Sequence, residues 1–366
     1  MLLVLNCGSQ SIKWKLFEAD LKLAKEGERE VFNPKNYQRM LTKELRKTAK
    51  YKKDIKVIGH RVVQGGNKFR RPTLITRATA RGEDERSSSP NRANLKELEK
   101  FNKLAPLHNP FNILGIRISQ KIFPNSKQIA VFDTGFYLNL PEKASNYTLP
   151  KYIIKKFGFQ RLGFHGISHE FVAKEAAQKI KKPFKKLKII TCHLGGGSSI
   201  TAIKNGRAVD TSMGFTPMEG VVMMTRPGDI DAGIVLELAK SFSPKRANEI
   251  LNFESGLKSI SGTKEMLEIL RKAKKGNQEA KLALEIFIYK IKKYIGAYFA
   301  VLGGCDLLVF TGAIGWGSLK IRKMICKDLA ILKNTKILAV ETDEELAIAK
   351  KLQKNYDKKR KKHSLV

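Results

Sequence analysis

The chain has 366 residues, 42% of them hydrophobic, with 70 Lys or Arg against 34 Asp or Glu and a formal net charge of +36. This hydrophobic content excludes an intrinsically disordered chain, and the length favours two domains with separate cores. No apolar run reaches the roughly 20 residues that a membrane helix needs. The basic residues are dispersed and form no nucleic-acid module, so we expect a solvated basic surface, and nucleic-acid binding is unlikely despite the charge.

The chain begins with a predicted strand, a Gly/Ser turn and a returning strand. Residues 2–6 are apolar, residues 7–11 read Cys-Gly-Ser-Gln-Ser, and residues 12–17 alternate between apolar and polar. A short apolar start without a basic n-region favours a strand over a signal peptide, so we expect a cytoplasmic protein. The four cysteines are far apart and lack metal-ligand spacing, which favours reduced thiols.

The rest of the first half contains two less regular stretches. Residues 19–53 are charged and predicted to be helical in part, and residues 70–94 are predicted to be an exposed insertion because they are rich in charge, serine and proline. Asp133 directly follows a predicted strand, and the carboxyl ends of strands commonly line the cleft of α/β proteins. Two strands and two helices complete this half, at 56–63, 128–132, 95–104 and 111–122.

A glycine-rich loop marks the second half. It follows the apolar strand 187–192, and a second strand, 200–204, leaves it before the hairpin turn Asn205-Gly206. Three consecutive glycines let backbone N–H groups face a ligand, and together with two serine hydroxyls they suit phosphate oxygens. Taken alone, the loop has an alternative interpretation as a Gly-rich surface turn. The loop reads His193, Leu194, Gly195, Gly196, Gly197, Ser198, Ser199.

Both halves therefore contain a strand, a Gly/Ser loop and a second strand. This repeat indicates a duplicated, two-lobed architecture with the ligand between the lobes. Further on, Arg226 lies among glycines and acids in a stretch that suggests phosphate handling. The remaining predicted elements are helices at 169–180, 231–241, 244–252, 263–274 and 277–302, strands at 307–310 and 336–340, and a basic helix that starts at Glu344.

In this order, the motifs resemble those of the acetate kinase family of acetate and propionate kinases. The resemblance implies an α/β fold of two actin-like (ribonuclease H-like) lobes with the active site in the cleft between them. We expect domains at 1–150 and 151–345, with a terminal helix at about 346–366 that packs back on the first. The motifs are NCGSQSIK, GHRVVQGG, APLHNP, FDTGFY, RLGFHGISH, HLGGGSSI, DTSMGFTPMEG, TRPGDID and ETDEELAIA.

The implied reaction is reversible, magnesium-dependent phosphoryl transfer from ATP to acetate, giving acetyl phosphate and ADP. By resemblance, Arg61 binds the acetate carboxylate, Arg226 stabilises the transferring group, and His165 contacts it. Asp133 is the acid that positions substrate or metal-bound water, since an ionised carboxylate substrate has no proton to give up. The alternative for each arginine is a structural ion pair.

The resemblance also assigns the metal, the acyl pocket and the phosphate contacts. Asn6 and Glu344 match the positions linked to Mg²⁺, or to Mn²⁺ in its place, although Asn6 could merely cap a turn and Glu344 merely start a helix. The implied homodimer forms through the second lobe, with the apolar helix 277–302 contributing. The acyl pocket matches Val63, Leu107, Phe164 and Pro217, with His108 near it. The first phosphate loop matches Ser9, Ser11 and Lys13.

The expected nucleotide side departs from the family pattern in three places. Gly196 stands where the family has Asn, Trp316 lies in the altered adenosine loop, and Leu267 cannot replace the usual arginine, whereas Glu265 can replace the acid. On the acyl side, the family's FDTAFH ends here in Tyr137. The expected nucleotide contacts are His193, Leu194, Gly195, Gly196, Gly197, Glu265, Met266, Leu267, Ala313, Ile314, Gly315, Trp316 and Gly317.

These departures leave alternatives open. Trp316 either fills the adenosine pocket or stacks on the base. The phosphoryl donor is therefore ATP, another NTP or pyrophosphate, and the acyl substrate is acetate or propionate, because one methylene contributes only about 1–3 kcal/mol of discrimination. A third hypothesis is a catalytically weak member of the family that acts as a basic nucleic-acid-binding protein.

Overall fold

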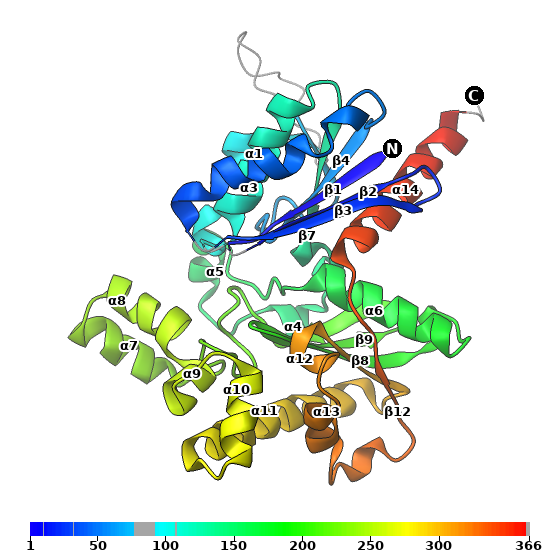
Figure 1. Cartoon of the computed structure of the whole chain (residues 1–366). Helices are drawn as coiled ribbons and strands as arrows, with labels where there is room; N and C mark the ends of the chain where they lie inside the picture. The colour runs from blue at the N-terminus through cyan, green and yellow to red at the C-terminus, as the bar shows by residue number, and fades with distance from the viewer. Residues whose placement is uncertain (10, 32, 77–91, 107, 364–366) are drawn as a thin grey trace. The chain divides into compact units, whose positions relative to one another are not determined.

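The computed structural model describes the chain except residues 10, 32, 77–91, 107 and 364–366 (Figure 1). Contacts group it into two compact units, Met1–Leu138 with Asp343–Val366, and Asn139–Thr342. Each unit contains one mixed β-sheet and its own helices. The sequence-based domain limits at 150 and 345 stay a prediction.

The sheet of the first unit has the strand order β3-β2-β1-β4-β7-β5-β6. β1, β2 and β3 are antiparallel neighbours, whereas β4 and β7 continue in parallel from β1. The four strands predicted in this half are confirmed. The strands are β1 (Leu2–Cys7), β2 (Ser11–Phe17), β3 (Leu23–Glu30), β4 (Val57–Val62), β5 (Thr73–Ile75), β6 (Arg92–Ala93) and β7 (Lys127–Phe132).

Helices cover both faces of this sheet because side chains alternate along β1. Leu3 and Leu5 join a core formed with α1 and α3, while Val4 lies on the other face. On that face, a Cβ at Gly59 would lie 2.7 Å from Leu352 and 2.8 Å from Ile348, so α14 packs directly on β4. The helices are α1 (Tyr37–Arg46), α2 (Leu95–Glu99), α3 (Asn109–Ile122) and α14 (Glu344–His363).

Two stretches of the first unit differ from the sequence-based expectation. The segment 19–53 contains the predicted helix, α1, but also the strand β3, which was not expected. β3 is an edge strand with almost all of its residues exposed, so it has no apolar face to reveal it; it pairs with β2 through its backbone and through Lys13–Glu28. The segment 70–94 contributes β5 and β6, and its middle, 77–91, lies outside the described residues.

The sheet of the second unit has the strand order β10-β9-β8-β11-β12. β8, β9 and β10 are antiparallel neighbours, and β11 and β12 continue in parallel from β8. This is the order and direction of β3-β2-β1-β4-β7, so the repeat predicted from the two Gly/Ser loops is confirmed. The strands are β8 (Lys188–Leu194), β9 (Ser198–Lys204), β10 (Arg207–Thr211), β11 (Leu307–Thr311) and β12 (Lys336–Ala339).

The strand β8 presents different chemistry to its two faces. Ile190, Cys192 and Leu194 join the apolar core that α11 completes, whereas Thr191 and His193 lie on the face covered by α6. The helices of the unit are α4 (Glu142–Ser145), α5 (Lys151–Phe157), α6 (Gly166–Lys179), α7 (Ala232–Ser241), α8 (Pro244–Glu249), α9 (Gly256–Ser261), α10 (Met266–Lys274), α11 (Gln278–Leu302), α12 (Gly312–Gly315) and α13 (Leu319–Cys326).

Two further expectations concern the cysteines and the membrane. All four cysteines are free thiols, as their spacing predicted. None of the described helices combines the length and hydropathy of a membrane span.

Candidate active site

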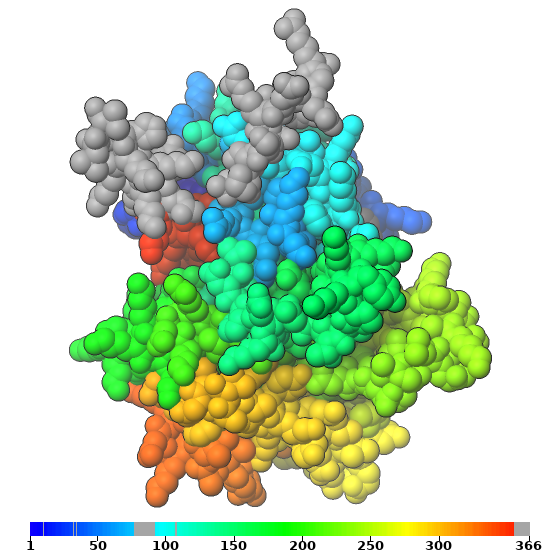
Figure 2. Space-filling model, turned by 180° about the vertical axis from the view of Figure 1, so that it is seen from behind, coloured from blue at the N-terminus to red at the C-terminus, as the bar shows by residue number. Residues whose placement is uncertain are grey.

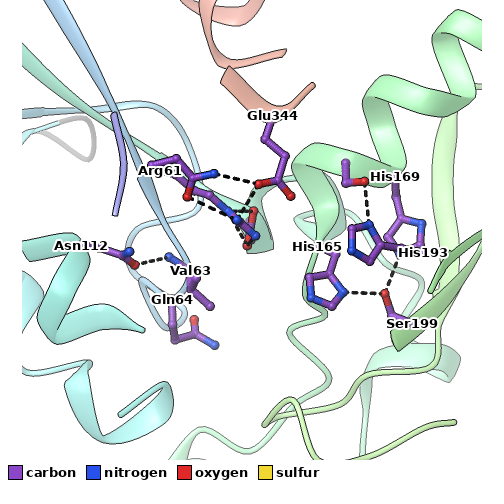
Figure 3. A network of polar contacts seen from close by, with 12 residues as sticks. Arg61, Val63, Gln64, Asn112, His165, His169, His193, Ser199 and Glu344 are labelled. Atoms are coloured by element: carbon purple, nitrogen blue, oxygen red, sulfur yellow. Dashed lines mark hydrogen bonds and ion pairs between the residues drawn. The ribbon is translucent and has the colours of Figure 1, made fainter. Parts of the chain in front are cut away.

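The first unit gathers a charged cluster, which we define as Asn6, Arg61, Asp133, Glu344 and Glu345. Asn6 lies near the end of β1, Arg61 in β4, Asp133 just after β7, and the two glutamates open α14. Arg61 Nη2 donates to Asp133 Oδ2 at 2.8 Å, and its Nη1 forms an ion pair with Glu344 (Figure 3). Asn6 Nδ2 donates to Glu344 Oε2 at 3.0 Å and to Glu345 Oε1 at 2.7 Å.

The charged cluster has an excess of negative charge, because three carboxylates surround one guanidinium. Burial raises the pKa of Glu344 to about 7; Arg61 opposes this rise, and Asp133 and Glu345 add to it. Burial alone would lower the pKa of Arg61, but its ion pairs with Asp133 and Glu344 raise it above its ordinary value. A divalent cation beside these carboxylates would favour their charged forms.

The donor set of the charged cluster fits Mg²⁺. This ion takes oxygen ligands and keeps several waters, so one or two carboxylates suffice. Among the described residues, no three His, Cys, Asp or Glu side chains are arranged to chelate a metal directly. Asn6, Asp133 and Glu344 therefore suit a magnesium ion that is bound largely through water.

The amino end of α3 fixes the chain that follows β4. Val63 N–H donates to Asn112 Oδ1 at 3.0 Å (Figure 3). Gln64 N–H donates to Asn109 Oδ1 at 2.9 Å. These bonds hold the buried Val63 in place directly after β4, the strand that contains Arg61. His108 directly precedes α3. Leu107, predicted for the same pocket, lies outside the described residues.

The first Gly/Ser loop is a tight turn, as predicted. Gly8 N–H donates to Ser11 O at 2.9 Å, and Ser9 lies within the bend. Lys13 is the cross-strand neighbour of Asn6 in the β1–β2 ladder. Its Nζ lies 2.7 Å from Glu28 Oε1, and about half of each side chain is exposed, so this ion pair is weak and can open for a ligand.

The second unit gathers a histidine cluster, which we define as His165, His169, His193 and Ser199. His165 has a left-handed backbone (φ 55°) and directly precedes α6. Its ring stacks on that of His193, with centroids 4.4 Å apart, and its Nδ1 lies 2.9 Å from Ser199 Oγ (Figure 3). Ser168 Oγ lies 2.8 Å from His193 Nδ1.

Arg226 and His165 flank the glycine loop. A Cβ at Gly197 would lie 3.4 Å from both Arg226 Nη2 and His165 Cε1, whereas a Cβ at Gly196 would meet nothing within 4 Å. Arg226 Nη1 donates to Pro217 O at 2.6 Å, and burial lowers the pKa of the guanidinium to about 10. This hydrogen bond is to a neutral carbonyl, and Arg226 forms no ion pair with any carboxylate of the described residues, so its positive charge is uncompensated there.

The two serines of this loop differ from the expectation. Both were predicted to offer hydroxyls to phosphate, but both are fully buried. Ser198 Oγ bonds to the backbone of Gly195, at 3.3 Å from its carbonyl, and Ser199 Oγ bonds to His165 and His169. Their side chains point to opposite faces of β9, and both faces are buried there, so Ser198 shapes the loop and Ser199 the histidine cluster.

The segment 313–317, which the sequence predicts to be the adenosine loop, packs against the glycine loop. A Cβ at Gly195 would lie 4.0 Å from Ala313 N, and one at Gly312 would lie 2.5 Å from Leu194 O. Trp316 is 45% exposed, and Arg322 donates to its carbonyl. Ile314 and Gly315 are buried, and Gly317 follows α12.

The other predicted nucleotide and acyl residues have mixed environments. Glu265 directly precedes α10, Met266 belongs to the apolar core, and Leu267 is 80% exposed. Phe164 is buried next to His165. Thus the 313–317 segment lies beside the glycine loop, while Met266 points into the core.

Sequence reasoning missed several residues of the two clusters. Glu345 and His169 lie inside the quoted motifs ETDEELAIA and RLGFHGISH, but they had no assigned role. Beside the charged cluster, Asn109 lies inside the motif APLHNP but also had no assigned role, and Asn112 carried no signal, since an asparagine in a helix is usually unremarkable. Thr191 lay in a strand predicted to be buried, where a hydroxyl needs a partner; that requirement was the available signal.

The duplicated sheet and the Gly/Ser hairpins define an α/β protein of two similar units, one with a carboxylate-rich cluster and one with a histidine cluster beside a glycine loop. The sequence profile of the Acetokinase family matches residues 28–357, and the chain belongs to this family. It is 40% identical to the acetate kinase of Carboxydothermus hydrogenoformans over 401 residues, which cover 95% of this chain and 97% of the relative.

Two solved structures of kinases that act on short carboxylic acids resemble this fold over nearly the whole chain. The propionate kinase of Francisella tularensis matches with a TM-score of 0.83 and 34% identity, covering 96% of this chain and 98% of that one. The acetate kinase of Porphyromonas gingivalis matches with a TM-score of 0.81 and 32% identity, covering 95% and 98%. The predicted two-lobed α/β class is thereby confirmed.

Proposed function

We propose that this chain is an acetate kinase that reversibly transfers the γ-phosphoryl group of ATP to acetate, giving acetyl phosphate and ADP. The observation that carries the proposal is the flanking of Gly197 by Arg226 and His165. A phosphoryl group in transfer spreads negative charge over three oxygens, so catalysis rests on positioning and on cationic donors. An uncompensated buried guanidinium beside an imidazole and a glycine loop supplies these.

The acceptor is held by the charged cluster. Arg61 binds the acetate carboxylate through its planar fork. Asp133, fully buried, fixes the Nε side of that fork through two contacts of 3.2 and 3.3 Å, so its role is positioning. Of the residues predicted for the acyl pocket, the buried Val63 lies in this unit and supplies an apolar side chain for the methyl group.

The metal and the donor complete the proposal. Asn6, Asp133 and Glu344 hold Mg²⁺ through its waters, and the ion supplies charge neutralisation for the nucleotide phosphates. Ser9, Ser11 and Lys13 bind phosphate in the first unit, and His193 with the glycine loop does so in the second. The segments 265–267 and 313–317 receive the nucleoside.

A donor screen tests this proposal. The enzyme is incubated with acetate, Mg²⁺ and one donor at a time (ATP, GTP, ITP or pyrophosphate), and acetyl phosphate is trapped as the hydroxamate. We expect all three nucleotides to serve, because the phosphate contacts do not recognise the base, and pyrophosphate to fail. The absence of hydroxamate with every donor would refute the kinase assignment. Formation of hydroxamate with pyrophosphate would refute the proposal that the donor must be a nucleotide.

Propionate is the second candidate acceptor. The likeness to a solved propionate kinase and the small discrimination that one methylene allows both favour it. We expect propionate to be used with a kcat/KM about tenfold below that of acetate, as one methylene in an apolar pocket dictates. The same hydroxamate assay with propionate measures this ratio.

We also propose a homodimer formed through the second unit. Every residue of α7 is at least partly exposed, yet the helix and the chain after it present Ile234, Leu236 and Phe242 to solvent, with Leu236 72% exposed. In Figures 1 and 2, α7 and α8 stand at one side of the second unit. Light scattering should give the mass of two chains, and Leu236→Glu should give one; Leu319→Glu, at another exposed leucine, is the control.

A further inference from the structure

His165 is the first member of a chain of hydrogen bonds that leads away from the glycine loop through three buried side chains. Ser199 Oγ lies 2.9 Å from His165 Nδ1 and 2.7 Å from His169 Nε2. His169 Nδ1 lies 2.7 Å from Thr191 Oγ1, whose other contact, to Thr201 O, is longer at 3.4 Å, so the shorter contact is the better acceptor for the threonine proton. Ser199, His169 and Thr191 are all fully buried, so the row His165–Ser199–His169–Thr191 is closed to water along those three members. Figure 3 shows Ser199 beside the two imidazoles.

The elements make this row rigid. His165 and His169 are one helical turn apart, and His169 N–H donates to His165 O at 2.9 Å. Thr191 and Ser199 lie on β8 and β9, which are paired in the same sheet. Because each partner belongs to a regular element, the distances are fixed by the packing of α6 on the sheet.

The protonation states within the row depend on one another. Burial lowers the pKa of His169 well below its ordinary value, and His193 adds to this, so His169 is neutral. A neutral imidazole has one N–H, so one of its nitrogens donates and the other accepts. The direction of the His169–Thr191 bond therefore sets the direction of the bonds on both sides of Ser199.

Several titratable and charged groups in the described part of the chain surround His165. They include His169 on α6, which shares Ser199 with it, His193 on β8, whose ring stacks on that of His165, and Arg226 in the loop after β10. Arg226 is a permanent cation, and a cation nearby disfavours an imidazolium. To donate to a phosphoryl oxygen while neutral, His165 needs its proton on Nε2, and its Nδ1 must then accept from Ser199.

We propose that Ser199, His169 and Thr191 are positioning residues that hold His165 as the neutral Nε2–H tautomer. Thr191 donates to His169 Nδ1, His169 Nε2–H donates to Ser199, and Ser199 donates to His165 Nδ1. His165 thus presents a fixed N–H beside Gly197 and Arg226. The proposal rests on the proposed function for the role of that N–H, but the tautomer itself is a property of the protein alone.

The direct test is ¹⁵N NMR of histidine-labelled protein at about pH 7.5, above the ordinary imidazole pKa. The chain has six histidines, and the His165 ring is assigned from the spectrum of His165→Gln. We expect His165 and His169 both to show Nε2–H. A wild-type His165 that shows Nδ1–H, or an imidazolium, would overturn the proposal.

Two identical substitutions separate the row from general packing. Thr191→Val removes the donor at the far end of the row, whereas Thr211→Val removes a buried hydroxyl that bonds to Thr201 in the same sheet. We expect Thr191→Val to mix the His165 tautomers and to lower kcat by about five- to tenfold, the worth of one hydrogen bond, with KM for acetate unchanged. Thr211→Val should do neither; equal effects of the two variants would overturn the proposal. Circular dichroism confirms that both variants fold.

The pH profile supplies a second readout. In Ser199→Ala, His165 loses its imposed tautomer, and only the imidazolium then guarantees an Nε2–H. Its kcat should therefore fall as pH rises through the range in which the imidazolium loses its proton, while the wild-type kcat does not fall in that range. A Ser199→Ala profile parallel to that of the wild type would overturn the proposal. If the wild type makes no acetyl phosphate, the proposed function fails, and the NMR result still decides the tautomer.

Discussion

The two polar clusters lie on sheets of the same strand order, yet their chemistry is opposite. The charged cluster contains three carboxylates around one arginine: Asp133 and Glu344 pair with Arg61, and Glu345 accepts from Asn6. The histidine cluster contains no carboxylate, and the arginine beside its glycine loop bonds to a carbonyl. The first favours a bound cation, and the second favours a bound anion.

The difference arises from what each sheet receives at the ends of its strands. In the first unit, α14 brings two glutamates to β1 and β4. In the second, α6 brings two histidines to β8 and β9, and the loop after β10 brings Arg226. One scaffold thus supports both electrostatic requirements of phosphoryl transfer, since the sheet sets positions and the added segments set charge.

Removing the uncompensated cation should have the largest effect. Arg226→Ala should lower kcat by about 10³ or more, the range for arginines on transferring phosphoryl groups, while KM for acetate changes little. Steady-state kinetics with ATP measures both. Arg207→Ala, which removes an exposed arginine from β10 of the same unit, should retain wild-type kcat. A loss below tenfold in Arg226→Ala would mean that the second cluster does not stabilise the transferring group.

Removing one carboxylate of the charged cluster should act on the metal. Glu344→Gln should raise the Mg²⁺ concentration needed for half-maximal activity by about 10–100-fold, as is usual for groups that orient a bound metal. A magnesium titration at saturating acetate and ATP measures it. Glu341→Gln, an exposed carboxylate three residues away, is the matched control. An unchanged magnesium requirement would assign Glu344 to holding Arg61 alone.

The exposed aromatic of the second unit should affect every nucleotide alike. Trp316→Ala should raise KM for ATP, GTP and ITP by about tenfold each, because stacking is worth about 1–3 kcal/mol and tolerates any base. Tyr152→Ala, which removes an exposed ring on α5, is the control. A lower KM in Trp316→Ala would show that the indole fills the nucleoside pocket instead of stacking in it.

The smallest effect is expected at the wall of the acyl pocket. Val63→Ala should improve propionate relative to acetate by about tenfold in kcat/KM, the worth of roughly one methylene. Val62→Ala, its fully buried neighbour in the core, should lower the melting temperature without moving that ratio. If both variants leave the ratio unchanged, Val63 does not contact the acyl group.

The sequence predicted the parts of this molecule that depend on local pattern. Apolar β-branched runs that stop at glycines predicted β1 and β8, and the quoted motifs predicted that Arg61 and Asp133 belong together. β3 escaped prediction because an exposed edge strand has no alternation of burial. The row from Thr191 to His165 escaped because it depends on the β8–β9 register and on the packing of α6, neither of which a linear pattern encodes.

The contact of Glu345 was missed for the same reason, because it depends on the fold and not on a local sequence pattern. Glu345 bonds to Asn6 across 339 positions of sequence, and only the return of α14 to the first sheet brings them together. A motif search finds both motifs but not their contact. Charge balance in the charged cluster was therefore invisible before the fold was known.

The packing of α14 on Gly59 has a consequence for biosynthesis. Ile348 and Leu352 cover one face of β4 in the first sheet. During synthesis on the ribosome, this apolar face therefore remains exposed to solvent until Ile348 and Leu352 have left the exit tunnel. The second unit, made of contiguous sequence, can fold cotranslationally while the first one waits. Nascent chains that stall before α14 should therefore expose the β1–β4 face to chaperones, and maturation of the first unit should follow synthesis of α14.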